Sequence, residues 1–151
     1  MGGVLSIDRQ NEAMRRLWPR FTVKGLNRLD RSARWIGEVK PQFARFTLEI
    51  RYSLGSFPQT RILSPELVRR PGDAGGALPH VYPPADDPRL CLFDPKAGEW
   101  TSTMAIAETI VPWALDWIAC YEWWLMTGVW RGGGRHAGDP PAESADEVHA
   151  E

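Results

Sequence analysis

The stretch Phe43-Ala44-Arg45-Phe46-Thr47-Leu48-Glu49-Ile50-Arg51-Tyr52 alternates apolar and polar side chains from Phe46 onward. Successive side chains of a β-strand point to opposite faces of the sheet, so this period of two predicts a strand with one buried face. Residues 34–39 before it and residues 60–64 after it read as two more strands, and residues 55–58 read as a turn. Connections this short favour hairpins over βαβ crossovers. We therefore predict an antiparallel β-meander at the centre of the chain.

A helix is predicted on each side of this meander. In the first, Met14, Leu17 and Trp18 form an apolar stripe between Asp8, which we interpret as the N-cap, and Pro19, which ends the segment. Residues 21–29 fit neither a helix nor a strand clearly. The meander and the two helices together predict an α+β fold.

The second helix is longer. Pro112 suits its first position and Gly128 suits its end. Large apolar side chains recur along it at helical spacing: Ile110, Trp113, Ala114, Trp117, Tyr121, Trp124 and Leu125. We interpret this face as hydrophobic core rather than as a cofactor site or a platform for stacking bases. Cys120, in the same helix, is expected to be a small buried residue.

The bulk composition is that of a single globular domain. The chain has 151 residues, of which 43% are hydrophobic and 25% are charged. It has no apolar run long enough to span a bilayer and no secretory signal pattern, so we expect a cytoplasmic protein that does not enter a membrane. Two cysteines do not make a disulfide framework. We predict one domain over residues 1–131 and a flexible tail, rich in Gly, Pro, Ala and Glu, over residues 132–151.

The charge is divided between the two halves of the chain. Residues 1–70 hold 14 Lys and Arg against 6 Asp and Glu, whereas residues 71–151 hold 4 against 13. Such a division can steer an acidic partner to the first half. The basic residues are spread over a predicted helix, turns and strands rather than gathered in one block, so we do not expect nucleic-acid binding.

Residues 70–89 are too rich in Gly and Pro for regular structure, yet they carry large apolar side chains. We expect an ordered loop, which is a frequent location for functional groups. His80 lies in this loop, and Cys91 follows in Arg89-Leu90-Cys91-Leu92-Phe93. A cysteine between two leucines is also compatible with an inert core residue.

The segment Pro79-His80-Val81-Tyr82-Pro83, followed by Leu90-Cys91-Leu92, resembles the active-site segment of ubiquitin-conjugating (E2) enzymes. In that family a His-Pro-Asn motif precedes the catalytic cysteine, and a tryptophan, a Thr-Ile pair and a long helix follow it. The counterparts here are Trp100 and Thr109-Ile110, with a helix from about Val111. The resemblance implies a ubiquitin-conjugating (UBC/E2) fold: an N-terminal helix, an antiparallel β-meander, an active-site loop and a long C-terminal helix.

The tryptophan-rich continuation is similar to the bacterial E2-like proteins of antiviral signalling operons of the CBASS type and of ubiquitin-like conjugation operons. Their series of short motifs is present in full: Pro112-Trp113-Ala114, Trp117, Tyr121-Glu122-Trp123-Trp124, Thr127-Gly128-Val129-Trp130 and Gly132-Gly133-Gly134-Arg135-His136. The similarity covers roughly residues 30–136. The resemblance implies that Cys91 is the nucleophile and His80 its neighbour in the site.

The resemblance implies an acyl transferase that carries a partner's C-terminus as a thioester on Cys91 and passes it to an amine. The implied partner is a cGAS-like nucleotidyltransferase (CD-NTase) in anti-phage defence or, alternatively, a ubiquitin-like protein. The sequence contains no adenylation motif, so an E1-like protein is expected to activate the carboxylate. No cofactor or metal is implied. A noncatalytic E2-fold binding module and a protease-like Cys/His pair are the competing interpretations.

His80 departs from the E2 pattern, because it aligns with the asparagine of the His-Pro-Asn motif while Leu78 stands at the histidine position. An imidazole donates hydrogen bonds and titrates near neutral pH. We expect His80 to stabilise the oxyanion, to assist proton transfer or to order the loop. A carboxylate that assists the incoming lysine would come from the four acidic residues near Cys91: Asp86, Asp87, Asp94 and Glu99. The alternative interpretation of each is a solvated loop charge. The thioester chemistry also requires an exposed thiolate.

Overall fold

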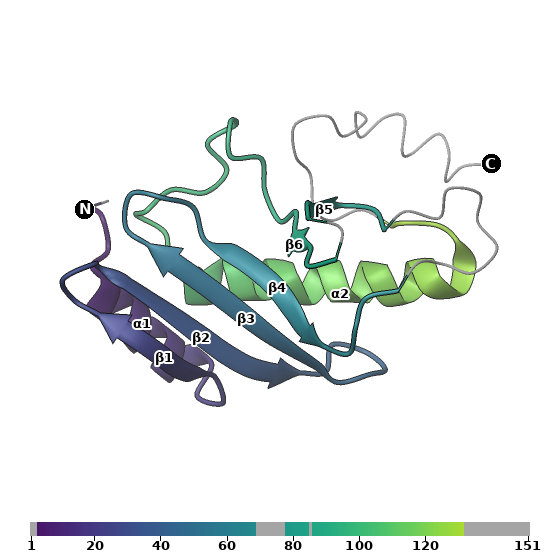
Figure 1. The fold of residues 1–151 in the computed structure, drawn as a ribbon, viewed down its shortest axis with the longest axis horizontal. Coiled ribbons are helices and arrows are strands. Elements are labelled where there is room, and N and C mark those ends of the chain that lie inside the picture. Colours follow the sequence, from purple (N-terminus) through teal and green to yellow (C-terminus); the bar gives the residue numbers. More distant parts are fainter. Residues whose placement is uncertain (1–2, 69–77, 85, 132–151) are drawn as a thin grey trace.

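The computed structural model describes residues 3–68, 78–84 and 86–131, so the predicted tail over 132–151 lies outside the described residues. A four-stranded antiparallel sheet occupies the middle of the chain (Figure 1). Its strands pair in sequence order and have the following bounds: β1 Thr22–Asn27, β2 Ser32–Val39, β3 Phe46–Ser53 and β4 Gln59–Ser64. The predicted meander is confirmed, and the ambiguous segment over 21–29 supplies its first strand.

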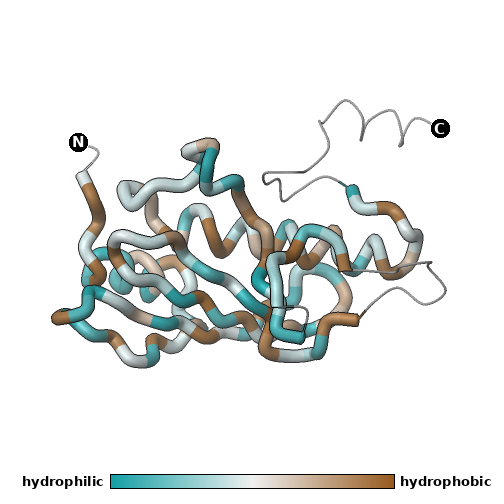
Figure 2. The backbone as a smooth tube through the Cα atoms, turned by 45° about the horizontal axis from the view of Figure 1, so that its top comes forward, coloured by the Kyte–Doolittle hydropathy of each residue, from teal (hydrophilic) through white to brown (hydrophobic). Residues whose placement is uncertain are grey.

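The register of the strands explains the alternation in the sequence. Trp35 pairs with Ile50, and Ile50 pairs with Thr60, and all three are buried. The neighbouring row, which contains Arg34 and Arg51, faces the other side of the sheet because the side-chain period of a strand is two. Hydrophobic and hydrophilic segments accordingly alternate along the strands (Figure 2).

Helix α1 spans Ile7–Leu17, and its N-cap is Ser6 rather than Asp8. The hydroxyl of Ser6 accepts a hydrogen bond from the backbone N–H of Arg9 at 3.1 Å. The prediction of Asp8 as the cap is therefore wrong. Ile7 is buried and has to lie inside the helix, so the helix starts one residue before Asp8. Asp8 lies in the first turn, where its carboxylate still interacts favourably with the positive end of the helix dipole.

A short 3₁₀ helix, η1 (Ile106–Glu108), leads into α2 (Ile110–Thr127). The long helix thus begins two residues before Pro112. A proline is tolerated there because the first four N–H groups of a helix have no partner within it. The helix ends as predicted: Gly128 adopts a left-handed conformation with φ 80° and donates its N–H to the carbonyl of Trp124 at 2.8 Å.

Both helices cover the same face of the sheet. The indole of Trp35 on β2 donates a hydrogen bond to Asn11 on α1, and Phe46 on β3 packs edge-on against Tyr121 on α2. The predicted core face of α2 is confirmed for most of its members: Ile110, Ala114, Trp117, Tyr121 and Trp124 are buried, whereas Trp113 and Leu125 are half-buried. The result is an α+β domain whose arrangement is compatible with an E2-like fold.

Two buried polar side chains fasten the connecting segments to the helices. Gln10 on α1 donates to the carbonyl of Met104 and accepts from the N–H of Ile106, each at 2.9 Å. Glu122 on α2 accepts from the backbone amides of Phe43 and Ala44 at 3.3 and 3.0 Å. Since a buried polar group without a partner is costly, these bonds fix the loops in one position.

Candidate active site around Cys91

Two short strands bring the predicted site residues together. β5 (Val81–Tyr82) pairs antiparallel with β6 (Arg89–Leu90), and Val81 lies opposite Leu90. The next residue on each strand is therefore His80 on one side and Cys91 on the other. The backbone N–H of Cys91 donates to the carbonyl of His80 at 3.0 Å. The structure thus places the two predicted site residues side by side.

The backbone of His80 is held from two directions. Its carbonyl accepts a second hydrogen bond, 2.9 Å long, from the indole N–H of Trp117 on α2. His80 also adopts a left-handed conformation with φ 56°. Asn, Asp and His are the side chains most often found there among residues other than glycine. The side chain at position 80 is therefore of a type that suits this backbone conformation.

The His80 ring belongs to an aromatic column that reaches from the loop into the core. The chain turns back after α2 (Figure 1) and places Trp130 against His80, with ring centroids 4.8 Å apart. Trp130 meets Trp117 edge-on at 5.2 Å, and Trp117 stacks on Tyr121 at 5.5 Å. The segment after α2 is thereby packed against the residue that contacts Cys91.

Cys91 itself is buried, with 0% of its surface exposed. The expectation of an exposed thiolate is therefore wrong for this conformation. The physical reason is visible in the chain, because Leu90, Leu92 and Phe93 on either side of it are buried as well. A reagent reaches this sulfur only after the surrounding segment has moved.

The tryptophan and the Thr-Ile pair downstream of Cys91 frame this segment. The indole N–H of Trp100 donates to the hydroxyl of Thr109 at 3.0 Å, just before α2 begins. Phe93, two residues after Cys91, packs against Trp100 and Trp113 with centroids 6.3 and 6.2 Å apart. These contacts tie the cysteine segment to the start of the long helix.

The comparison with protein families agrees with this geometry. The family described as "Type II CBASS E2 protein" matches residues 10–137. The chain belongs to this E2-like family. A comparison with curated proteins found no match. The recognised resemblance to the E2-like proteins of CBASS operons is confirmed.

Of the four acidic residues near Cys91 in this CBASS E2 chain, three have defined partners. Asp87 pairs with Arg61 at 2.9 Å and with Arg89 at 3.0 Å, and these two guanidinium groups, Arg89 foremost, lower its pKa. Asp94 and Glu99 accept hydrogen bonds from backbone amides within one turn. Asp86 is exposed. Their contacts give Asp87, Asp94 and Glu99 a structural role.

Cys120 is less buried than the small buried residue expected from the sequence. It is half-buried, and its Sγ donates to the carbonyl of Arg131 at 3.2 Å. Partial burial and the negative charge of Asp116 both raise the pKa of this thiol. Sequence periodicity could not reveal this contact, because it depends on the return of the chain after α2. Cys120 in this CBASS E2 chain therefore helps to hold the segment that carries Trp130.

The part of the chain that the structure describes contains no group of three or more His, Cys, Asp or Glu side chains placed to hold a metal ion. Among the same residues, no helix combines the length and the apolar character needed to cross a membrane.

The hydrogen bond from the Trp117 indole to the His80 carbonyl was not predicted from the sequence. A tryptophan on the core face of a helix is a signal for such a contact, since a buried indole N–H usually finds an acceptor.

Proposed function

We propose that this chain is an E2-like acyl transferase that carries the C-terminus of a partner protein as a thioester on Cys91. The main support is the hydrogen bond between the Cys91 amide and the His80 carbonyl, which brings the two residues of the E2-like segment together. Membership of the CBASS E2 family supports the same reading. An E1-like protein supplies the activated carboxylate.

The proposed reaction has two acyl transfers. The Cys91 thiolate attacks the activated carbonyl carbon, a C–S bond forms, and the former carrier leaves with the proton that the thiol gave up. An amine then attacks the thioester carbonyl, and the Cys91 thiolate leaves as an amide forms and the amine loses a proton. His80 stands beside the cysteine, where an N–H donor stabilises the oxyanion of each tetrahedral intermediate or its backbone orders the loop.

The burial of Cys91 requires an opening step before the first transfer. Trp130 contacts the ring of His80, and the hydrogen bond from Cys120 to Arg131 anchors the same segment. We propose that release of this segment frees the His80 loop and exposes the sulfur. Protein loops of this kind open on microsecond to millisecond timescales.

We propose a cGAS-like nucleotidyltransferase as the cargo, because the matching family is named for CBASS systems. A ubiquitin-like cargo is the alternative. The burial of Cys91 also favours a second candidate function, a noncatalytic E2-fold module that binds its partner through the same surface. The two functions differ in whether a covalent bond to Cys91 forms.

The deciding experiment incubates the chain with the products of its neighbouring genes and follows adducts by nonreducing gel electrophoresis and mass spectrometry. Wild type and Cys120→Ala should form an adduct that thiol reagents cleave. Cys91→Ser should form a stable ester, and Cys91→Ala should form none. A Cys91→Ala protein with full activity in phage defence would disprove the thioester function and leave the noncatalytic module.

A further inference from the structure

A cationic depression lies on the face of the sheet opposite the two helices. Its volume is about 450 Å³, and all four strands contribute to its lining. Lys24 of β1, Arg34 of β2 and Arg51 of β3 form one row across the sheet, because Lys24 pairs with Arg34 and Arg34 pairs with Arg51. Gln59 of β4 continues the same row. The sheet therefore presents three cations and an amide side by side.

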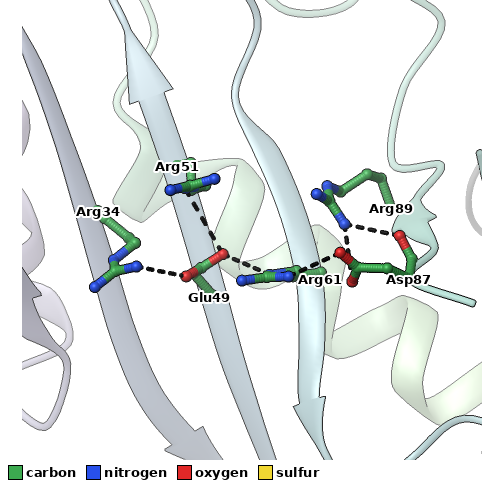
Figure 3. Close-up of polar contacts among 6 residues, drawn as sticks. All are labelled: Arg34, Glu49, Arg51, Arg61, Asp87 and Arg89. Carbon is green, nitrogen blue, oxygen red and sulfur yellow. Dashed lines mark hydrogen bonds and ion pairs between the residues drawn. The ribbon is translucent and has the colours of Figure 1, made fainter. Parts of the chain in front are cut away.

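A buried carboxylate lies next to this row of cations. The side chain of Glu49 is only 2% exposed and lies between three arginines (Figure 3). It approaches Arg61 most closely, at 2.6 Å, and lies 3.3 Å from Arg34 and 3.9 Å from Arg51. A hydrogen bond to Glu49 is also the largest cause that raises the pKa of Arg61. Glu49 therefore pairs most closely with Arg61 and shares its single negative charge with Arg34 and Arg51.

The ion pairs leave a surplus of positive charge at the depression. On the far side, Asp87 bridges Arg61 and Arg89, so two carboxylates face four arginines in this network (Figure 3). Arg34 and Arg51 remain on the depression side, with 39% and 54% of their side chains exposed. Lys24, also exposed, adds a third charge.

The remaining lining matches an oxyanion. Three serines, Ser32, Ser53 and Ser56, add hydroxyl groups beside the cations, and the described lining residues include no carboxylate. Guanidinium groups bind phosphate oxygens through paired N–H donors, and hydroxyls and lysine complete such sites. Phe57 also lines the depression; its ring packs against Phe93 with centroids 5.6 Å apart and is still 46% exposed, so part of it is available for stacking. Cations, hydroxyls and one exposed aromatic ring in a cavity of this size suit a nucleotide.

We propose that this depression binds the phosphate group of a soluble, nucleotide-sized ligand, with Arg34, Arg51 and Lys24 holding the phosphate oxygens. Its lining shares no residue with the His80–Cys91 site. A concave site with clustered hydroxyls suits a compact phosphate better than an extended acidic protein surface, which would need contacts over a wide, flat area. The inference is independent of thioester formation and extends beyond the proposed transferase function.

The test uses the full chain with Cys91→Ala, so that covalent chemistry plays no part. ATP and inorganic phosphate are titrated at low salt by calorimetry, and amide shifts are followed by NMR. ATP should saturate with a Kd below about 1 mM and bind more tightly than phosphate. The amides of Gly25, Ser53 and Ser56 should shift, and added salt should weaken binding because it screens exposed charges.

Arg51→Gln should weaken ATP binding about tenfold, as expected for the loss of one charge-assisted contact of about 1.4 kcal/mol. Arg28→Gln is the matched control, since it removes another exposed guanidinium whose Nε pairs with a carboxylate, here Asp8. It should leave the affinity within about twofold. Lys24→Gln, at an exposed strand position, provides the same test if Arg51→Gln does not fold.

Any one of several results would overturn the proposal. These are no saturation by ATP up to about 10 mM, equal weakening by Arg28→Gln and Arg51→Gln, shifts confined to other amides, and binding to phosphatidic acid vesicles without binding to ATP. If an acidic partner protein shifts the same amides while ATP does not, the surface is a protein interface and the ligand assignment is wrong.

Discussion

Replacement of Trp130 by alanine should expose Cys91. The indole makes two ring contacts, with His80 at 4.8 Å and with Trp117 at 5.2 Å. Aromatic pairs of this kind contribute about 0.5–1.5 kcal/mol each. Their loss removes about 1–3 kcal/mol from the closed conformation, which raises the population of an open conformation about 5- to 150-fold. Because the His80 carbonyl binds the Cys91 amide, an open His80 loop leaves the cysteine segment less well covered.

The assay is the rate at which a soluble maleimide modifies Cys91. When opening and closing are fast relative to modification, the rate follows the open population. Cys120 is replaced by serine in every protein, because serine leaves one reactive thiol and keeps a donor for the carbonyl of Arg131. Trp130→Ala should then accelerate modification about 5- to 150-fold, while peptide mapping verifies that Cys91 is the modified residue.

Trp18→Ala is the control for a general loss of stability. Trp18 is also a half-buried tryptophan, but it packs at the end of α1, where its indole N–H donates to the carbonyl of Ala107 at 2.7 Å. Equal acceleration by the two variants would mean that modification proceeds through global unfolding. An unchanged rate in Trp130→Ala would refute the view that the segment after α2 controls access to Cys91.

Three further variants test the fold. Gly37→Ala should lower the unfolding temperature, because a Cβ at position 37 would overlap the ring of Phe21, and a thermal melt that matches wild type would contradict this packing. Tyr52→Phe should keep or raise stability by up to about 1 kcal/mol in denaturant titrations, since the buried hydroxyl has no partner among the described residues; a clear loss would reveal one. Arg89 and Arg61 lower the pKa of Asp87. The stabilising contribution of this carboxylate is therefore present above its pKa in the unfolded chain and is lost as the pH falls through its lower pKa in the folded protein. Asp87→Asn should reduce the slope of stability against pH on the acid side, and an identical slope would count against the ion pairs.

The strands and the long helix were predictable because their signals are local. The alternation from Phe46 to Tyr52 indicates directly which side chains face the core. Gly128 marks the helix end because glycine readily adopts the left-handed conformation found there. Ser6 and Asp8 are equally acceptable caps by residue type. The choice between them depends on the burial of Ile7 against the rest of the domain, which no local pattern contains.

The candidate site depends even more on contacts that no local sequence pattern contains. The resemblance to E2 enzymes implies that His80 and Cys91 belong to one site, but their contact requires the β5–β6 pairing and the Trp117 indole, which lies 37 positions after His80. The exposure of Cys91 was inferred from the chemistry that the resemblance implies. The continuous apolar run from Leu90 to Phe93 is the better guide, since a short run without polar alternation is typically buried on all sides.

The burial of Cys91 has a consequence for how the proposed transferase would be regulated. A thiol that is covered at rest is shielded from oxidants and from small thioesters, so reaction depends on a partner that stabilises the open conformation. Such a partner must bind the open form more tightly by at least the free energy of the contacts that Trp130 loses, about 1–3 kcal/mol. Trp130→Ala would remove that requirement. The variant should therefore accept small-molecule thioesters that wild type excludes, while its rate with the physiological donor changes less.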